Sequence, residues 1–161
     1  FKEYYGQDFP YEKFQEHYRE VIHEHIRRHG SSAKPGLYEL LDSLKKLGIP
    51  MAVATSSSPS HAFMYLENGR AMEYFQVIIA GDMVTMAKPD PQIYRLACER
   101  LAVAPEQALA LEDSYNGLRS AHRAGMKAIM VPDLLTDSTP VDDIIYAKVP
   151  SLLEVKEMFG W

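Results

Sequence analysis

Hydrophobic residues recur every three or four positions near the start of the chain, a spacing typical of helices with one apolar face. The first such stretch, residues 11–29, contains no Pro or Gly and is followed by Gly30-Ser31-Ser32. A second stretch begins after Pro35-Gly36 and repeats leucines up to Leu47, and Gly48 then takes the usual position after a helix end. The pattern therefore predicts two helices in this part of the chain.

Beyond Gly48, short and wholly apolar runs alternate with further helical stretches. The runs are residues 51–54, 77–80, 109–111 and 128–131, and the helical stretches are about 60–68, 91–102, 114–124 and 151–159. Strands that are apolar on both faces and alternate with helices form parallel sheets covered on both sides. The predicted fold class is therefore α/β, a Rossmann-like parallel sheet with flanking helices.

The change from helices alone to strands alternating with helices divides the chain into two parts. Residues 1–33 are expected to form an appendage or part of a helical cap, and residues 34–161 the α/β core. Residues 133–143, which carry four aspartates and a proline, are predicted to be a surface loop.

The length and charge of the chain limit the number of domains and the kinds of partner that can be expected. The chain has 161 residues and 18.3 kDa, enough for one domain with a short appendage. Its 17 Lys and Arg are scattered and are outnumbered by 22 Asp and Glu, so nucleic acid is not an expected partner. No apolar run approaches the roughly 18 to 20 residues of a membrane span, and Cys98 is the only cysteine, so a cytoplasmic location is predicted.

Polar residues follow three of the predicted strands. Hydroxyl residues Thr55, Ser56, Ser57 and Ser58 follow the first, and Lys88-Pro89 lies after the second. Because ligands of open α/β sheets bind beyond the carboxyl ends of the strands, these positions are where chemistry is expected. Hydroxyls beside free backbone N–H groups bind phosphate oxygens, and a lysine fixed before a proline anchors an anion.

The third strand ends directly in Glu112-Asp113. Paired carboxylates at the end of a buried strand are costly unless they have a partner, and oxygen ligands of this kind suit Mg²⁺. Each of the three groups also has a structural explanation. Ser58 before Pro59 and Ser114 or Asp113 are suitable N-caps, and Lys88 alone reads as a solvated lysine. Together the hydroxyls, the lysine and the carboxylates favour phosphoryl transfer.

These motifs resemble those of a known family. Ala52-Val53-Ala54-Thr55-Ser56-Ser57, Ala87-Lys88-Pro89-Asp90-Pro91 and Leu111-Glu112-Asp113-Ser114 through Gly117 are similar in order and spacing to motifs II, III and IV of the haloacid dehalogenase superfamily. The similarity is greatest to its β-phosphoglucomutase-like phosphatase branch.

The resemblance implies roles for several residues. Thr55, with Ser56 and Ser57, would bind the phosphoryl group, and Lys88 would neutralise its charge. Glu112 and Asp113 would help to hold Mg²⁺, and the substrate would be a small phosphorylated metabolite. Residues 11–29 would belong to the cap that excludes water.

One motif of that family has no counterpart in the chain. Its nucleophile is the first aspartate of an Asp-x-Asp motif, and no two aspartates here are spaced two apart; Asp133 is followed by Leu135 at the second position. In the family that motif ends a central strand between the strands of motifs II and IV. We therefore expect residues 1–161 to be a fragment whose central strand comes from a missing N-terminal segment or a second chain.

Three functions are consistent with these observations. The first is a Mg²⁺-dependent phosphatase acting through an aspartyl-phosphate in the intact protein, and the second is a sugar phosphomutase with the same site. The third is an inactive fragment or interaction module. A separate candidate, the i, i+4 pair His25 and His29, has metal-ligand spacing, but a solvated helix face explains it better.

Overall fold

The structure, a computed structural model, describes residues 2–30 and 32–161. The chain forms two compact units, Phe1–Ser32 and Ala33–Trp161. Within the described residues, no helix combines the length and the apolar composition that a membrane crossing requires. The assignment of the first unit as a cap stays a prediction.

The first unit consists of α1 (Lys2–Tyr5) and α2 (Tyr11–His29). The bounds of α2 are those predicted from its periodicity. The rings of Tyr5, Phe9, Phe14 and Tyr18 follow one another in a row, with centroids 5.1, 5.5 and 6.1 Å apart. His25 and His29 are both exposed, as expected for a solvated helix face.

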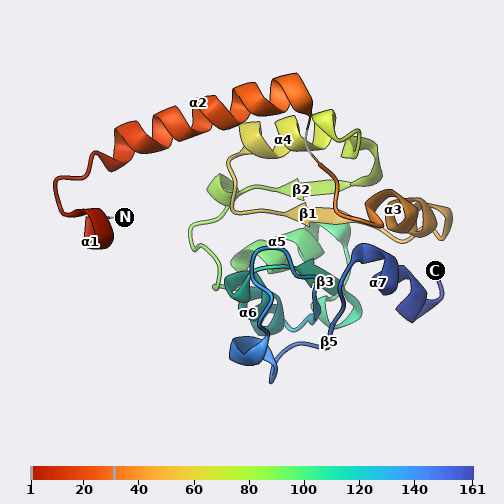
Figure 1. Cartoon of the computed structure of the whole chain (residues 1–161). Helices are drawn as coiled ribbons and strands as arrows, with labels where there is room; N and C mark the ends of the chain where they lie inside the picture. The colour runs from red at the N-terminus through yellow and green to blue at the C-terminus, as the bar shows by residue number, and fades with distance from the viewer. Residues whose placement is uncertain (1, 31) are drawn as a thin grey trace. The chain divides into compact units, whose positions relative to one another are not determined.

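The second unit alternates strands and helices in the predicted order (Figure 1). The strands are β1 (Ala52–Ala54), β2 (Val77–Ile79), β3 (Leu109–Glu112), β4 (Lys127–Met130) and β5 (Ala147–Lys148). The α-helices are α3 (Leu37–Lys46), α4 (Pro59–Asn68), α5 (Gln92–Leu101), α6 (Tyr115–Ala124) and α7 (Leu152–Phe159). Short 3-10 helices are η1 (Met72–Tyr74), η2 (Gly81–Met83), η3 (Pro105–Gln107) and η4 (Thr139–Val141).

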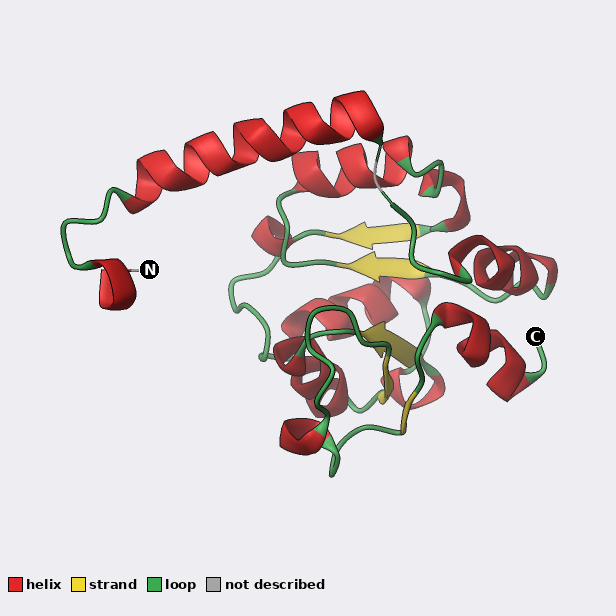
Figure 2. Cartoon of the chain, viewed as in Figure 1, coloured by secondary structure: helices red, strands yellow, loops and turns green. Residues whose placement is uncertain are grey.

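All strand pairs are parallel, but the strands form two separate sheets (Figure 2). One sheet pairs β1 with β2, and the other has the order β3-β4-β5. The expectation that the predicted strands do not form one continuous sheet is thereby confirmed. Within residues 2–30 and 32–161, β1 and β3 each have a neighbouring strand on one edge only.

Apolar helix faces cover both sides of the strands and hold the two sheets together. On one side, buried residues of α5 and α6 pack on the strands, and Ile93 of α5, Leu118 of α6 and Met130 of β4 lie in that cluster. On the other side α3 packs against α7, and Leu41, Ile129 and Val155 lie in that cluster. Alternate residues of β4 therefore face opposite layers, as a strand buried on both faces requires.

The segment 133–143 differs from its prediction in one respect. Most of it is exposed, but Val141 in η4 is fully buried in the cluster beneath α6. Val141 stands between a proline and an aspartate, apart from Leu134 and Leu135, and gives no periodic signal, so the sequence pattern did not indicate this anchor.

Candidate functional site

The predicted site residues meet at the carboxyl ends of β1 and β3, and Lys88 joins the two ends. Its Nζ donates to the backbone oxygen of Ala54 at 3.1 Å and pairs with Oε1 of Glu112. The side chains of Lys88 and Glu112 are only 9% and 8% exposed. One buried ion pair therefore spans the two sheets at the point where their strands end.

Tyr94 of α5 completes this cluster. Its hydroxyl donates to Glu112 Oε1 at 2.9 Å and lies 3.4 Å from Lys88 Nζ, and the Lys88 ammonium also lies 4.8 Å from the centre of its ring. Burial, followed by the charge of Glu112, raises the pKa of the Tyr94 phenol, so it remains a donor. Tyr94 was not among the residues predicted from the sequence, because a tyrosine at helical spacing reads as core.

The second oxygen of Glu112 is bound by the backbone that follows. The amides of Asp113 and Ser114 both donate to Oε2 at 3.2 Å, and the Ser114 hydroxyl donates at 3.0 Å. Ser114 is also the N-cap of α6, since its Oγ accepts from the amide of Gly117 at 3.0 Å. A Cβ on Gly117 would lie 2.0 Å from the Glu112 carboxylate, so only glycine fits there.

These contacts set the charge state of Glu112. Burial by itself raises the pKa of its carboxyl, but the Lys88 ammonium and the hydrogen bonds from Tyr94 and Ser114 outweigh burial and hold that pKa below its usual value. Glu112 is therefore ionised at neutral pH and is the fixed counter-ion of Lys88.

The hydroxyl residues after β1 form an exposed turn beside this pair. The Thr55 amide continues the ladder to β2 by donating to Ile79, and its Oγ1 accepts from the Ser57 amide at 3.1 Å. Ser56 and Ser57 are exposed. Ser58 directly precedes α4, as predicted for an N-cap residue. Its side chain, however, accepts no hydrogen bond from a backbone amide of that helix. The Ser58 hydroxyl instead bonds to Ser60 and His61, so Ser56 and Ser57 carry the exposed hydroxyls of the turn.

The carboxylates of Glu112 and Asp113 differ in whether they are available to bind a metal ion. Glu112 is occupied by Lys88, Tyr94 and the α6 N-terminus, whereas the Asp113 carboxylate has no hydrogen bond or ion pair among residues 2–30 and 32–161. No group of three metal-ligating side chains occurs in the same residues. Mg²⁺ is commonly held by one or two carboxylates together with substrate phosphate and water, and Asp113 meets that requirement.

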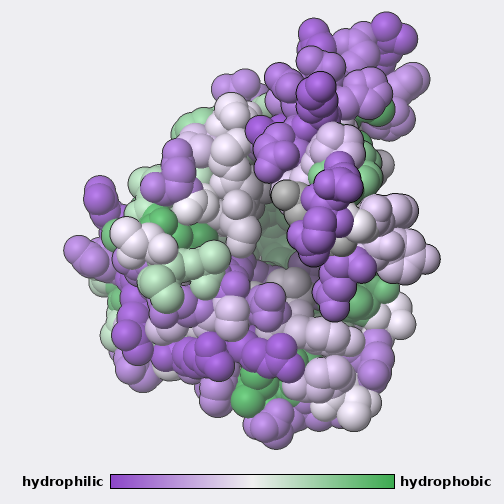
Figure 3. Space-filling model, turned by 90° about the vertical axis from the view of Figure 1, so that its left-hand side faces the viewer, coloured by the Kyte–Doolittle hydropathy of each residue, from purple (hydrophilic) through white to green (hydrophobic). Residues whose placement is uncertain are grey.

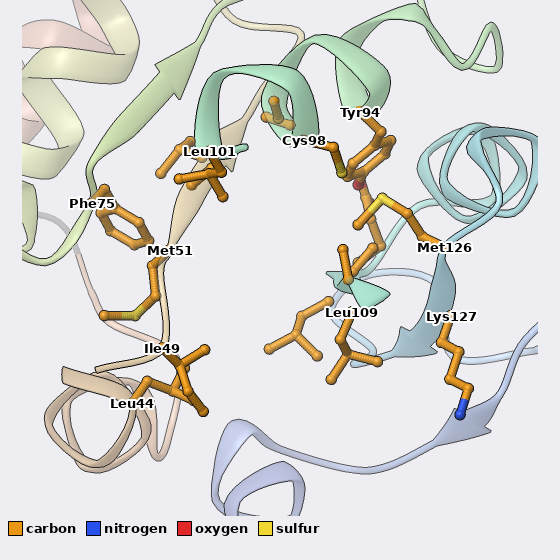
Figure 4. A pocket seen from close by; sticks show the side chains of 18 of the residues that line it. Leu44, Ile49, Met51, Phe75, Tyr94, Cys98, Leu101, Leu109, Met126 and Lys127 are labelled. Atoms are coloured by element: carbon orange, nitrogen blue, oxygen red, sulfur yellow. The ribbon is translucent and has the colours of Figure 1, made fainter. Parts of the chain in front are cut away.

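The site opens into a cavity of about 1020 Å³ between β1 and β3. Thr55, Lys88 and Asp113 are among its lining residues. Most of the side chains labelled in Figure 4 are apolar, and Lys127 is the charged one among them. Figure 3 looks at the side toward which β1 points and shows a mostly hydrophilic surface.

Replacing Tyr94 by phenylalanine tests the cluster. The substitution removes one donor to the ionised Glu112 and leaves the ring in place, so we expect the free energy of unfolding to fall by about 1–3 kcal/mol. Tyr115→Phe is the matched control, because its hydroxyl donates to the backbone of an exposed loop residue, Asp137, and we expect a change within about 0.5 kcal/mol. Urea unfolding of both variants measures the difference, and equal effects would contradict a special role for Tyr94.

Comparison with known proteins gives a family match and several relatives for this chain. A family model described as haloacid dehalogenase-like hydrolase matches residues 1–131. Protein CbbY of Cereibacter sphaeroides is 46% identical over 106 residues, which are 64% of this chain and 46% of that protein. The phosphorylated carbohydrates phosphatase of Thermotoga maritima is 38% identical over 117 residues, which cover 71% of this chain and 54% of the relative.

A solved structure extends the similarity to the fold. The crystal structure of CbbY from Rhodobacter sphaeroides in complex with phosphate superposes with a TM-score of 0.78 at 35% identity. The match covers 92% of this chain and 67% of the CbbY chain. The chain spans about half the length of the two curated relatives described above.

Proposed function

We propose, since the chain belongs to the haloacid dehalogenase-like hydrolases, that it forms the phosphate-binding part of a phosphatase acting on a small phosphorylated metabolite. The observation that carries this proposal is the buried Lys88–Glu112 pair, held at the ends of β1 and β3 beside the Thr55 turn. The phosphatase names of its relatives and the phosphate in the CbbY complex support the same class of substrate.

The residues of the site would divide the work of phosphoryl transfer. The Thr55 hydroxyl, the Ser56 amide and the hydroxyls of Ser56 and Ser57 would donate to the phosphoryl oxygens. Lys88, positioned by Ala54, Tyr94 and Glu112, would stabilise the negative charge that the transferring group carries. Glu112 positions Lys88 and does not itself need to contact the substrate.

Asp113 is the carboxylate that would hold Mg²⁺, with Glu112 contributing only if its bond to Lys88 is exchanged. When bound, Mg²⁺ would neutralise phosphate charge.

The family's nucleophile motif has no counterpart in the sequence of the chain. No pair of its aspartates has the Asp-x-Asp spacing, and Asp133 instead pairs with Lys34 at 3.4 Å. We propose that the nucleophilic carboxylate is supplied by polypeptide outside these 161 residues, and that the chain alone does not turn over phosphomonoesters.

A chimera tests this proposal. The part of Cereibacter sphaeroides CbbY that precedes the region matched here is joined in front of Phe1, and the chimera is compared with the 161-residue chain. We expect the chimera, with Mg²⁺, to release inorganic phosphate from sugar phosphates and p-nitrophenyl phosphate. Isomerisation of a sugar phosphate without phosphate release would instead identify a mutase. A folded chimera inactive in both assays would contradict the proposed function.

A further inference from the structure

Helix α6 lies against Glu112 and also against the turn that carries Lys88. It packs on α5 and on β3 (Figure 1), and at its N-terminus the amide and hydroxyl of Ser114 donate to the Glu112 carboxylate. Two side chains further along the helix, those of Ser120 and Arg123, reach the turn. Neither of these two residues belongs to the sequence motifs described above.

The turn that carries Lys88 connects β2 to α5. The Asp90 amide closes it by donating to the Ala87 oxygen at 3.0 Å, and the Asp90 carboxylate accepts from the Gln92 amide at 2.9 Å. Both bonds join residues that are close in sequence. They hold the turn to the start of α5, but they do not fix its distance from Glu112 on β3.

Two consecutive carbonyls of the turn accept hydrogen bonds from α6. The Ser120 hydroxyl donates to the Asp90 oxygen at 2.6 Å, and the Arg123 guanidinium donates to the Pro89 oxygen at 3.1 Å. Ser120 and Arg123 are three residues apart and are therefore neighbours on the helix surface. Because the N-terminus of α6 also holds Glu112, the helix connects the turn to the end of β3.

The bond from Ser120 is the stronger of the two restraints. Ser120 is 0% exposed and lies on α6 between the buried residues Leu118 and Ala121. A buried hydroxyl without a partner is costly, so the donor stays on the Asp90 oxygen. The bond from Arg123 is exposed and competes with water, so it adds a weaker restraint.

We propose that Ser120 and Arg123 are positioning residues for Lys88. They fix the turn relative to the end of β3, so that the ammonium reaches the Ala54 oxygen and Glu112 at the same time. With a displaced turn, the long lysine side chain could reach one of these partners but not both. For catalysis the inference rests on the proposed function, because a charge misplaced by about 1 Å can cost about 10²-fold in rate.

The alternative is that both residues only hold α5 and α6 together, and two control substitutions distinguish it. Arg119→Met matches Arg123→Met, because Arg119 also lies on α6 and donates to a proline carbonyl, that of Pro140, at 3.1 Å. Val155→Ala matches Ser120→Ala, because Val155 is also 0% exposed but lies in α7, in the opposite layer. Neither control residue contacts the turn that carries Lys88.

The first measurement uses the 161-residue chain and needs no activity. Hydrogen exchange of the Lys88 ammonium is followed by NMR of lysine side-chain nitrogens, at a temperature where circular dichroism shows each variant folded. We expect exchange to be about tenfold faster in Ser120→Ala, and to rise less in Arg123→Met, because opening of the ion pair exposes the ammonium protons to water. Both control variants should stay within about twofold of the unsubstituted chain.

The second measurement uses the active chimera. Ser120→Ala should lower kcat by about tenfold or more and change KM by less than about threefold, because Lys88 acts mainly on the charge of the transferring group. Arg123→Met should lower kcat less, and Arg119→Met should leave it unchanged. An inactive chimera would overturn the proposed function only, since the exchange measurement decides the positioning role without it.

Three results would overturn the inference. One is Lys88 exchange that is the same in Ser120→Ala and Arg123→Met as in the unsubstituted chain. Another is an equal rise in a variant and its matched control, which would indicate a general loosening of the fold. The third is an unchanged kcat for Ser120→Ala in an active chimera. Arg123→Met alters an exposed side chain, so with Arg119→Met it decides the question even if Ser120→Ala does not fold.

Discussion

Replacing Lys88 by methionine is expected to lower the free energy of unfolding of the chain by about 3–5 kcal/mol at neutral pH, the cost of breaking a buried ion pair. The substitution leaves the carboxylate of Glu112, 8% exposed, without its cation. Lys34→Met is the matched control, because Lys34 pairs with Asp133, which is 59% exposed, and an exposed pair is worth about 0–1 kcal/mol. Urea unfolding of the three proteins measures both differences.

The loss in the Lys88→Met variant should depend on pH. In the native chain the pKa of Glu112 lies below its ordinary value of 4.5, so its contribution to stability is complete above that value and is lost as pH falls through the folded pKa. Without the ammonium, burial prevails and raises the pKa of Glu112, so the variant gains stability as pH falls. The difference between the two proteins should therefore shrink between about pH 7 and pH 4.

Adding Glu112→Gln to the Lys88→Met variant removes the unpaired charge and should restore part of the lost stability at neutral pH. A difference that stays constant across this pH range, or a double variant no more stable than the single one, would contradict the pairing of Lys88 with Glu112.

The same substitution is expected to have the largest effect on catalysis. In the active chimera described above, Lys88→Met should lower kcat by about 10³-fold or more, since removal of a group that stabilises transferring phosphoryl charge costs on this scale. Phosphate release is measured at a temperature where circular dichroism shows the variant folded. Lys34→Met in the chimera serves as the control and should keep kcat within about twofold, because its ammonium is engaged with Asp133 and the Pro132 oxygen. A Lys88→Met chimera that retains most of its kcat would remove Lys88 from the mechanism.

Much of the fold could be predicted because its signals are local. The apolar runs at 51–54 and 128–131, which became β1 and β4, and the helix at 11–29 follow from the spacing of side chains that must be buried. The separation of β1 from β3 could be expected as well, although from the motif order and the family's topology rather than from any pattern in the residues themselves.

The contacts within the site could not be predicted from local sequence patterns. β5 has two residues and gives no periodic signal, and the hydrogen bond from Tyr94 to Glu112 joins residues 18 positions apart. The sequence pattern assigned Glu112 and Asp113 one shared role, whereas the structure pairs Glu112 with Lys88 and leaves Asp113 available. Which of two adjacent carboxylates takes the cation depends on how β3 and α5 pack, and that is a tertiary property.

The measurement that tests the account most directly is the rate of phosphate release from p-nitrophenyl phosphate, compared between the 161-residue chain, the chimera and the Lys88→Met chimera with Mg²⁺ present. We expect the chimera to release phosphate about 10³-fold faster than its Lys88→Met variant, and the 161-residue chain to release none above background. Release by the isolated chain at the rate of the chimera would contradict the account, because the nucleophile would then lie within these 161 residues.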